Sequence, residues 1–192
     1  MNKIKLALTG TVLGSVLGGL GGLVVATPAL ADERACRGTM GAVSVDGLRV
    51  PQGATCILVG TRVKSDIKVE RNATLVARKV KVGGNVQAEG ARAVSLTAKS
   101  YVRGNVQVKQ GGAATVTSSR IGEDVQLDDN RRYQRVSGNR IGGNVQVMAN
   151  RDGVRIYRNS IKGDLQCKEN SPRPTGSRNA VGGNKEDQCR RF

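Results

Sequence analysis

The chain has 192 residues and a formal net charge of +16, with 31 Lys and Arg residues against 15 Asp and Glu residues. It contains no His and no Trp, which excludes imidazole acid–base chemistry. The positive excess favours anionic partners such as nucleic acid, acidic polysaccharide, anionic lipid or cell-wall polymer, and carries no information about the fold.

Residues 1–31 have the composition of a secretory signal peptide. Met1–Lys5 is a short basic head, residues 6–31 carry no charge, and Ala29–Ala31 is a small-x-small cleavage site. We therefore expect cleavage after residue 31, export from a bacterial cell, and no stable membrane insertion afterwards. The uncharged stretch is also long enough to cross a bilayer of ~30 Å, so an uncleaved anchor is the alternative.

An eight-residue phrase returns along the rest of the chain at intervals of 19 or 20 residues. Its clearest copy is Arg140–Val147, and an Asn or Asp residue marks the same place in every copy. These marker residues are Asp66, Asn85, Asn105, Asp124, Asn144, Asp164 and Asn184. A period of this length in a strand-like sequence indicates a solenoid, in which each repeat forms one coil.

Apolar residues alternate within each repeat. Val or Ile stands three residues before every marker, and apolar residues stand one and three residues after nearly every marker. This period predicts a strand with one buried face, and the Gly-Asn or Gly-Asp step predicts a corner. A second strand is expected about ten residues later, as at 93–96, 114–117 and 153–156. The sequence therefore predicts an all-β fold, a single-stranded parallel β-helix of six or seven coils without helices.

The repeats extend over residues 60–167, and the two ends have the character of caps. Residues 32–59 are predicted to form an N-terminal cap with a degenerate first coil, and residues 168–192 a C-terminal cap that loses the apolar alternation. Open solenoid ends expose unpaired backbone and invite end-to-end stacking, which cross-linked and charged termini oppose. Self-association into a scaffold is therefore one alternative function.

Four cysteines in an exported chain predict two disulfides, with three possible pairings. Cys36 and Cys56 are 20 residues apart, and Cys167 and Cys189 are 22 residues apart, each about one coil. Residues one coil apart stack at roughly 4.8 Å, inside the ~4.4 to 6.8 Å range of disulfide Cα separations. We therefore expect these two pairs. Zinc is the alternative for four cysteines, but no Cys-x-x-Cys pair exists, and we expect no metal and no cofactor.

Gln stands two residues after five successive markers and is expected to point outward between inward-facing neighbours. The column consists of Gln87, Gln107, Gln126, Gln146 and Gln166. Stacked amides can hydrogen-bond along such a ladder, as they do in cross-β structures, which would make the column structural. The alternative is a row of amide donors and acceptors that meets a polymer, with Gln107, Gln126 and Gln146 at its centre.

Three pairs of arginines are separated by one coil. They are Arg120 with Arg140, Arg131 with Arg151, and Arg135 with Arg155. Like charges about 5 Å apart repel by somewhat under ~1 kcal/mol in water, and nothing in folding requires such stacking. The pairs therefore predict one side of stacked Arg and Gln that binds a repeating anionic polymer: a polysaccharide, a cell-wall polymer or extracellular nucleic acid, without specificity. Arginines that extend into solvent beside Asp128, Asp129 and Asp152 are the alternative.

An acidic cluster raises the alternative of a polysaccharide-active enzyme, because such chemistry uses paired carboxylates. Its members are Glu123, Asp124, Asp128 and Asp129. We expect these residues to form salt bridges with neighbouring arginines and predict no catalytic residues, since no insertion is long enough to build a cleft. Calcium at Asp124 and Asp164 is not expected, because they lie two coils apart. Aromatic rings are too few to predict specific recognition of nucleic acid.

At these residues the chain resembles the right-handed parallel β-helix superfamily. It is similar to small exported bacterial proteins with Gly-Asn-Val-Gln repeats and an ending like residues 163–167 followed by 182–189. The likeness covers roughly residues 56–189 and implies the fold, export and the disulfides. That group has no assigned activity, so the resemblance implies no function. The residues themselves predict an exported, non-catalytic surface or matrix protein that binds anionic polymers.

Overall fold

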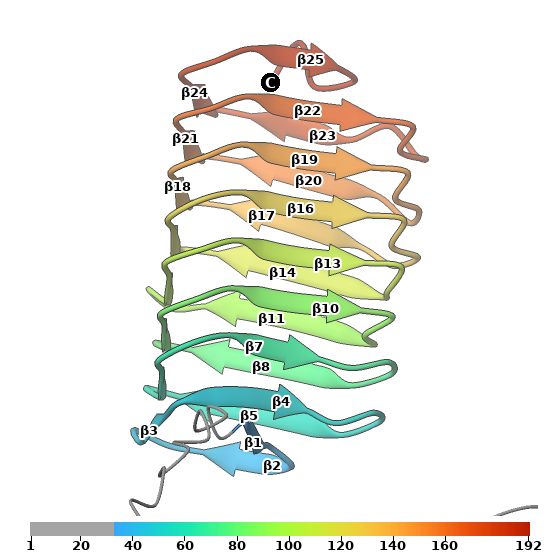
Figure 1. Cartoon of the computed structure of the whole chain (residues 1–192). Coiled ribbons are helices and arrows are strands. Elements are labelled where there is room, and N and C mark those ends of the chain that lie inside the picture. Colours follow the sequence, from blue (N-terminus) through green and yellow to red (C-terminus); the bar gives the residue numbers. More distant parts are fainter. Residues whose placement is uncertain (1–32) are drawn as a thin grey trace, which may run out of the picture. The chain divides into compact units, whose positions relative to one another are not determined.

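The structure is a computed structural model that describes residues 33–192 as a stack of coils (Figure 1). These residues form 25 strands and no helix, and every strand pairs in parallel with strands one coil away. The predicted all-β parallel solenoid is therefore confirmed. The predicted signal peptide, residues 1–31, lies outside the described residues. Within residues 33–192, no helix is long and apolar enough to cross a membrane.

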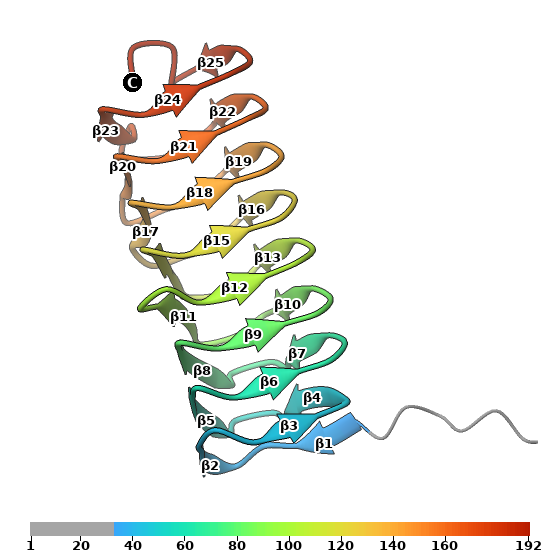
Figure 2. The same cartoon turned by 90° about the vertical axis from the view of Figure 1, so that its left-hand side faces the viewer.

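The strands form three sheets, here named A, B and C, which are the three sides of the coil (Figure 2). Sheet A contains β1 (Glu33–Ala35), β4 (Gly47–Val50), β7 (Ile67–Val69), β10 (Val86–Glu89), β13 (Val106–Lys109), β16 (Val125–Asp128), β19 (Val145–Met148), β22 (Leu165–Lys168) and β25 (Lys185–Asp187). Sheet B contains β2 (Gly38–Met40), β5 (Thr55–Val59), β8 (Thr74–Arg78), β11 (Ala93–Thr97), β14 (Ala113–Thr117), β17 (Gln134–Ser137), β20 (Val154–Tyr157) and β23 (Thr175–Ser177). Sheet C contains β3 (Ser44–Val45), β6 (Arg62–Val63), β9 (Lys81–Val82), β12 (Tyr101–Val102), β15 (Arg120–Ile121), β18 (Arg140–Ile141), β21 (Ser160–Ile161) and β24 (Ala180–Val181).

Stacking of like residues on like residues builds the core. Val106 pairs with Val86 in the coil before it and with Val125 in the coil after it, and all three side chains are fully buried. Burial of one such side chain stabilises the fold by about 1.5 to 3 kcal/mol relative to leaving it exposed. The alternating pattern in the sequence is therefore the inward and outward alternation of each strand.

The sequence predicted at least two strands in each coil, and the structure has three. The third is a two-residue strand such as β18, in which Arg140 is exposed and Ile141 is buried. Two residues are too few to show alternation, so only backbone pairing identifies this strand. Sheets A, B and C hold nine, eight and eight strands, so the solenoid has about eight turns. The prediction of six or seven was too low because residues 33–59 pair their backbone in all three sheets despite their irregular sequence.

The marker residues form the corner between sheets C and A, as predicted. Each side-chain Oδ1 accepts a hydrogen bond from the backbone N–H of the next marker, for example Asn85 from Asn105 at 2.8 Å and Asp124 from Asn144 at 2.6 Å. Only an acceptor oxygen is needed, which explains why Asn and Asp both serve in the column. A glycine precedes most markers because a Cβ at Gly143, for example, would lie 2.1 Å from Asp124 Oδ1.

Besides Ser65, Glu123 is the second exception to this glycine column. Its Oε2 accepts a hydrogen bond from Asn105 Nδ2 at 2.7 Å. Its own N–H reaches the carbonyl of Gly104 at 3.3 Å, longer than the 3.0 Å between the Gly143 N–H and the Glu123 carbonyl. Glu123 and its neighbour Asp124 therefore take part in the hydrogen bonds of this corner. Their role separates them from Asp128 and Asp129, the other two members of the acidic cluster predicted from the sequence.

Two further ladders of asparagines occupy the other corners and were not predicted. They are Asn130, Asn150 and Asn170 between sheets A and B, and Asn139, Asn159 and Asn179 between sheets B and C, all buried. Asn150 Oδ1 accepts from the Asn130 N–H at 3.1 Å, and its Nδ2 donates to the Leu127 carbonyl at 2.7 Å. Both ends of the buried amide are thus satisfied. The signal was present in the sequence as two sets of Asn at 20-residue intervals.

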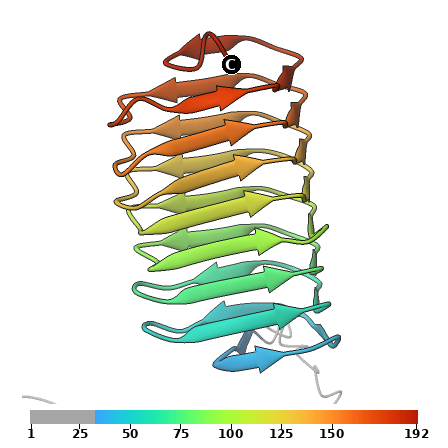
Figure 3. The ribbon, with the colours of Figure 1, turned by 180° about the vertical axis from the view of Figure 1, so that it is seen from behind.

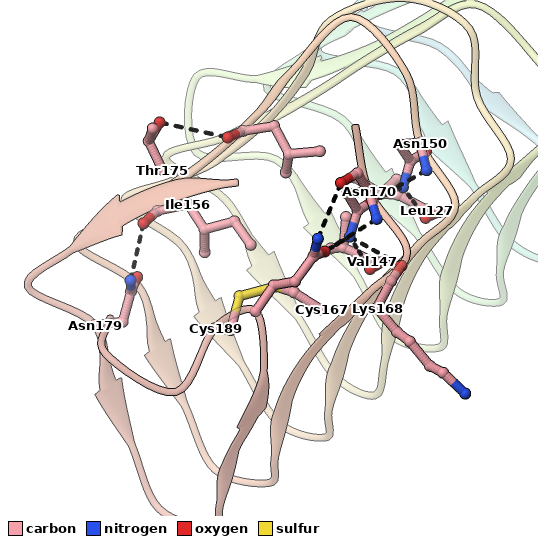
Figure 4. The surroundings of a disulfide bond; sticks show 12 residues. Leu127, Val147, Asn150, Ile156, Cys167, Lys168, Asn170, Thr175, Asn179 and Cys189 are labelled. Atoms are coloured by element: carbon pink, nitrogen blue, oxygen red, sulfur yellow. Dashed lines mark hydrogen bonds between the residues drawn. A yellow bond between two sulfur atoms is a disulfide. The ribbon is translucent and has the colours of Figure 1, made fainter. Parts of the chain in front are cut away.

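Both predicted disulfides are present. Cys36 and Cys56 join the first coil to the second with a Cα–Cα distance of 5.5 Å. Cys167 of β22 joins Cys189, which follows β25, with a Cα–Cα distance of 5.2 Å (Figure 4). All four cysteines are buried, so each disulfide closes one end of the core.

Candidate anion-binding surface

Acidic and basic residues are segregated among the three sheets. Within residues 33–192, the strands of sheets B and C contain no Asp or Glu, whereas the strands of sheet A contain several. The basic residues in the strands of B and C are Arg62, Arg78, Lys81, Arg120, Arg135, Arg140 and Arg155. The turns that join sheet B to sheet C also lack acidic residues and add Lys79, Lys99, Arg158 and Arg178.

A group of four basic residues lies at the C-terminal end of sheet B, the sheet that faces the viewer in Figure 3. Arg135 of β17 pairs in register with Arg155 of β20, and both are exposed. Arg158 follows β20 and Arg178 follows β23, and both are exposed. We name these four residues the arginine cluster. They surround a hollow of about 410 Å³ that is also lined by Ser137, Tyr157 and Ser177.

No member of the arginine cluster forms an ion pair with another residue in the described part of the chain. The ion pairs found there involve Arg49, Lys64, Lys68, Lys109 and Lys168. The predicted salt bridges between the acidic cluster and neighbouring arginines are therefore wrong, and Asp128 instead lies 3.6 Å from Lys109. A guanidinium carries five N–H donors in a planar fork, so the cluster can bind phosphate, sulfate or carboxylate oxygens in bidentate fashion.

The other predicted arginine pairs lie elsewhere on the coil. Arg120 and Arg140 stack in register on sheet C. Arg131 and Arg151 follow the buried asparagines at the corner between sheets A and B, and both are exposed. The three pairs thus occupy three parts of the surface rather than one side. Arg131 has Arg92 and Arg132 beside it in another hollow, and the pair on sheet B has Arg158 and Arg178 beside it.

The glutamine column lies on sheet A, away from the arginine cluster. Gln107, Gln126 and Gln146 stack in register and point outward, as predicted. Within residues 33–192 the glutamine side chains that form hydrogen bonds are those of Gln134 and Gln188, which lie outside this column, so the predicted amide ladder is absent. Water competes for these accessible amides, whereas the buried asparagines have only each other and the backbone.

A shallow groove of about 1300 Å³ runs along sheet A beside the glutamines. Gln87 and Gln107 line it, together with equal numbers of acidic and basic residues: Glu70, Glu89, Asp128 and Asp129 against Lys68, Arg71, Lys109 and Arg131. The side-chain hydrogen bond from Arg49, at 3.0 Å, and that from the Gln52 N–H lower the pKa of Glu70. Charges on this face therefore compensate each other, which does not favour a polyanion.

Asp128 is a partly buried carboxylate of this groove. Burial raises its pKa, and the nearby Lys109 ammonium opposes the rise only in part. Its Oδ1 is buried without a hydrogen-bond partner in the described part of the chain. The residue thus carries a cost of desolvation that its ion pair does not fully offset.

Tyr133, Tyr157, Arg158 and Arg178 were not among the predicted site residues. The signal for Arg158 and Arg178 was their spacing of 20 residues, which Arg135 and Arg155 share, whereas Tyr133 and Tyr157 are 24 residues apart. Arg158 and Arg178 adopt positive φ angles of 55° and 57°, at a corner position where Gly138 also stands with a φ of 68°. A side chain with a Cβ is strained in this conformation, and glycine is not.

No group of three or more His, Cys, Asp or Glu residues that could hold a metal ion occurs within residues 33–192. No known protein family, curated protein or solved structure matches the chain.

Proposed function

We propose that this protein is an exported, non-catalytic surface or matrix protein that binds anionic polymers through the arginine cluster. The observation that supports this most directly is the group of four exposed arginines, which form no ion pair within residues 33–192 and lie on a sheet whose described strands contain no acidic residue. The Arg120 and Arg140 pair on sheet C provides a second basic column for a long polymer.

The electrostatics of the cluster favour a partner with repeated negative charges. Neighbouring coils place like charges about 5 Å apart, which costs about 0.8 kcal/mol per pair in water and more near the protein surface. A polyanion relieves this repulsion and releases its own counterions when it binds, so affinity falls with rising salt. The rigid backbone pairing of sheet B holds the arginines in place before the ligand arrives, which lowers the entropy cost of binding.

Two disulfides support a non-reducing environment, which is consistent with export. The signal peptide predicted at residues 1–31 supports the same compartment. A non-catalytic role is supported by the lack of His and by the division of the acidic cluster, in which Glu123 and Asp124 hold the corner ladder. The proposed location is therefore the cell envelope or the extracellular space.

The test compares the binding of the mature protein to heparin and to poly(dT) across a range of salt concentrations. We expect the double variant Arg135→Ala/Arg155→Ala to weaken binding at low salt by at least about tenfold and to lower the salt slope by about 2. The matched control is Lys68→Ala/Lys168→Ala, which removes the same charge from sheet A and leaves the cluster intact. No binding at low salt, or equal losses in both variants, would contradict the proposal.

Self-association is the second candidate, and the ends of the stack favour it. Among residues 33–192, β1 pairs only with β4, and β25 pairs only with β22, so each has one unpaired edge. Unpaired edges are templates for pairing with another chain. Sedimentation with and without reductant tests this role, and a monomer under both conditions excludes it.

A further inference from the structure

Two of the three tyrosines of the chain stand on the same face of sheet B as the arginines. Tyr133 directly precedes β17 and is 37% exposed, and Tyr157 is the last residue of β20 and lines the hollow beside Arg158. Outward positions alternate along a strand, so Tyr133 and Arg135 share the outer face, as do Arg155 and Tyr157.

The two rings bracket the paired arginines. Gln134 pairs with Val154 and Ser137 pairs with Tyr157, so Tyr133 and Tyr157 are separated by four residues along the sheet and by one strand across it. That offset corresponds to roughly 14 Å. Arg135 and Arg155 lie between the rings, and Arg155 Cζ is 5.9 Å from the centroid of Tyr133. Flat aromatic surfaces and cationic groups therefore alternate across this part of the sheet.

We propose that the anionic polymer bound here is a single-stranded nucleic acid, whose bases stack on Tyr133 and Tyr157 while its phosphates meet the arginine cluster. This inference rests on the function proposed above and specifies its ligand. Stacking of a base on an aromatic side chain is independent of sequence, because every base has a planar face. The arginines supply the salt-dependent contacts to the backbone.

Other polyanions can bind the arginine cluster but have no exposed bases that stack on the two tyrosine rings. A duplex hides the faces of its bases inside the helix, so a duplex meets the arginines and not the rings. A sulfated polysaccharide likewise satisfies the arginines but has no planar base to stack. The expected order of affinity at matched salt is single strand, then duplex or heparin.

The first measurement uses tyrosine fluorescence, because the chain has no Trp. A Tyr101→Phe background leaves Tyr133 and Tyr157 as the only emitters. We expect a dT oligonucleotide to quench this emission, and heparin to bind without quenching it.

The second measurement uses the anisotropy of a labelled dT oligonucleotide and competition by heparin. The variant Tyr133→Thr/Tyr157→Thr introduces the residue type found at outward positions of other sheet B strands, such as Thr74 and Thr117, so the fold is preserved. We expect it to weaken oligonucleotide binding by at least about tenfold and heparin binding by no more than about fivefold, because loss of Tyr133 also removes the ring that orients Arg155. Tyr133→Phe/Tyr157→Phe keeps the rings and should retain oligonucleotide affinity.

The outcomes separate the two proposals. Absence of binding to both polymers contradicts the proposed function. Binding of heparin and oligonucleotide with equal losses, or with no loss, in the threonine variant overturns the single-strand assignment and leaves polyanion binding intact. Tighter binding of duplex than of single strand also overturns it. Thermal unfolding of each variant verifies that lost binding does not reflect lost folding.

Discussion

The guanidinium of Arg155 lies over the ring of Tyr133, with Cζ 5.9 Å from the ring centroid. The two residues belong to neighbouring coils, so the contact links one turn of the solenoid to the next. A cation above an aromatic face is stabilised by about 0.5 to 1 kcal/mol at an exposed site. The ring therefore orients Arg155, whereas Arg135 has no cation–π contact in the described part of the chain.

The role of this contact can be tested with substitutions that keep the positive charge. Arg155→Lys and Arg135→Lys both lose the planar fork that binds phosphate in bidentate fashion, but only Arg155→Lys loses the stacked guanidinium. We expect Arg155→Lys to lose about two- to fivefold more affinity for poly(dT) than Arg135→Lys, measured by anisotropy at one salt concentration. Equal losses would assign no role to the ring.

Replacement of Arg158 by glycine should separate stability from binding. Arg158 has a φ of 55°, a conformation that costs a residue with a Cβ about 1 kcal/mol and costs glycine little. Part of that gain is offset by the greater freedom of glycine in the unfolded chain. Arg158→Gly should therefore match or exceed the wild type in urea unfolding while binding heparin more weakly.

The control for Arg158→Gly is Gly138→Ala, which places a Cβ at the same corner position one coil earlier. It should lower the free energy of unfolding by about 1 kcal/mol, because Gly138 has a φ of 68°. A marked loss of stability in Arg158→Gly would mean that the side chain supports the fold rather than a ligand.

Asp128 makes the stability of the protein depend on pH in a defined direction. Burial raises its pKa in the folded state, so the folded state binds the proton more tightly than the unfolded state. The contribution of Asp128 is therefore most favourable below the ordinary carboxylate pKa of about 3.9 and is lost as pH rises through the raised value. Asp128→Asn should be more stable than the wild type at pH 7, and the difference should shrink towards pH 3.

Urea unfolding at several pH values measures this difference for Asp128→Asn. The difference between the two proteins isolates Asp128 from all other carboxylates. If the variant is less stable at pH 7, the ion pair with Lys109, at 3.6 Å, outweighs the cost of burial.

Gly143 should tolerate no side chain. A Cβ would lie 2.1 Å from Asp124 Oδ1 and 3.0 Å from the Glu123 carbonyl carbon, which would break the hydrogen bond to the Asn144 N–H. We expect Gly143→Ala to lower the free energy of unfolding by about 3 kcal/mol, from overpacking together with an unsatisfied donor. Gly41→Ala is the matched control, since nothing lies within 4 Å of its added Cβ, and it should change stability by less than about 0.5 kcal/mol.

The asparagine ladders differ in what they demand of the side chain. Asn150 uses its Nδ2 to donate to the Leu127 and Met148 carbonyls, so Asn150→Asp would place a carboxylate against carbonyl oxygens. We expect this variant to lose about 3 kcal/mol or more. Asp124 serves only as an acceptor, so Asp124→Asn should unfold within about 0.5 kcal/mol of the wild type. Similar losses in both variants would refute the distinction between the two corners.

Much of the fold could be predicted from the sequence because each coil is the template for the next. Residues such as Val86 and Val106 occupy equivalent positions in adjacent coils. A 20-residue period therefore predicts which side chains contact each other. The same reasoning identified both disulfides, since Cys36 and Cys56 lie one coil apart. The buried asparagines were missed although their spacing was visible, because Asn at a turn does not by itself indicate burial.

The sequence alone determined the repeat, the inward columns, the corner at Asn144 and the pairing of the cysteines, because all of these depend on contacts between equivalent residues of adjacent coils. Only the tertiary structure decided which outward columns share a face. A two-residue strand such as β18 turns the coil into three sides, which places Arg140, Arg155 and Gln146 on three different sheets. The direction of the chain after a turn depends on the backbone dihedral angles of the turn, such as the positive φ of Arg158. The periodicity of the sequence does not indicate these angles.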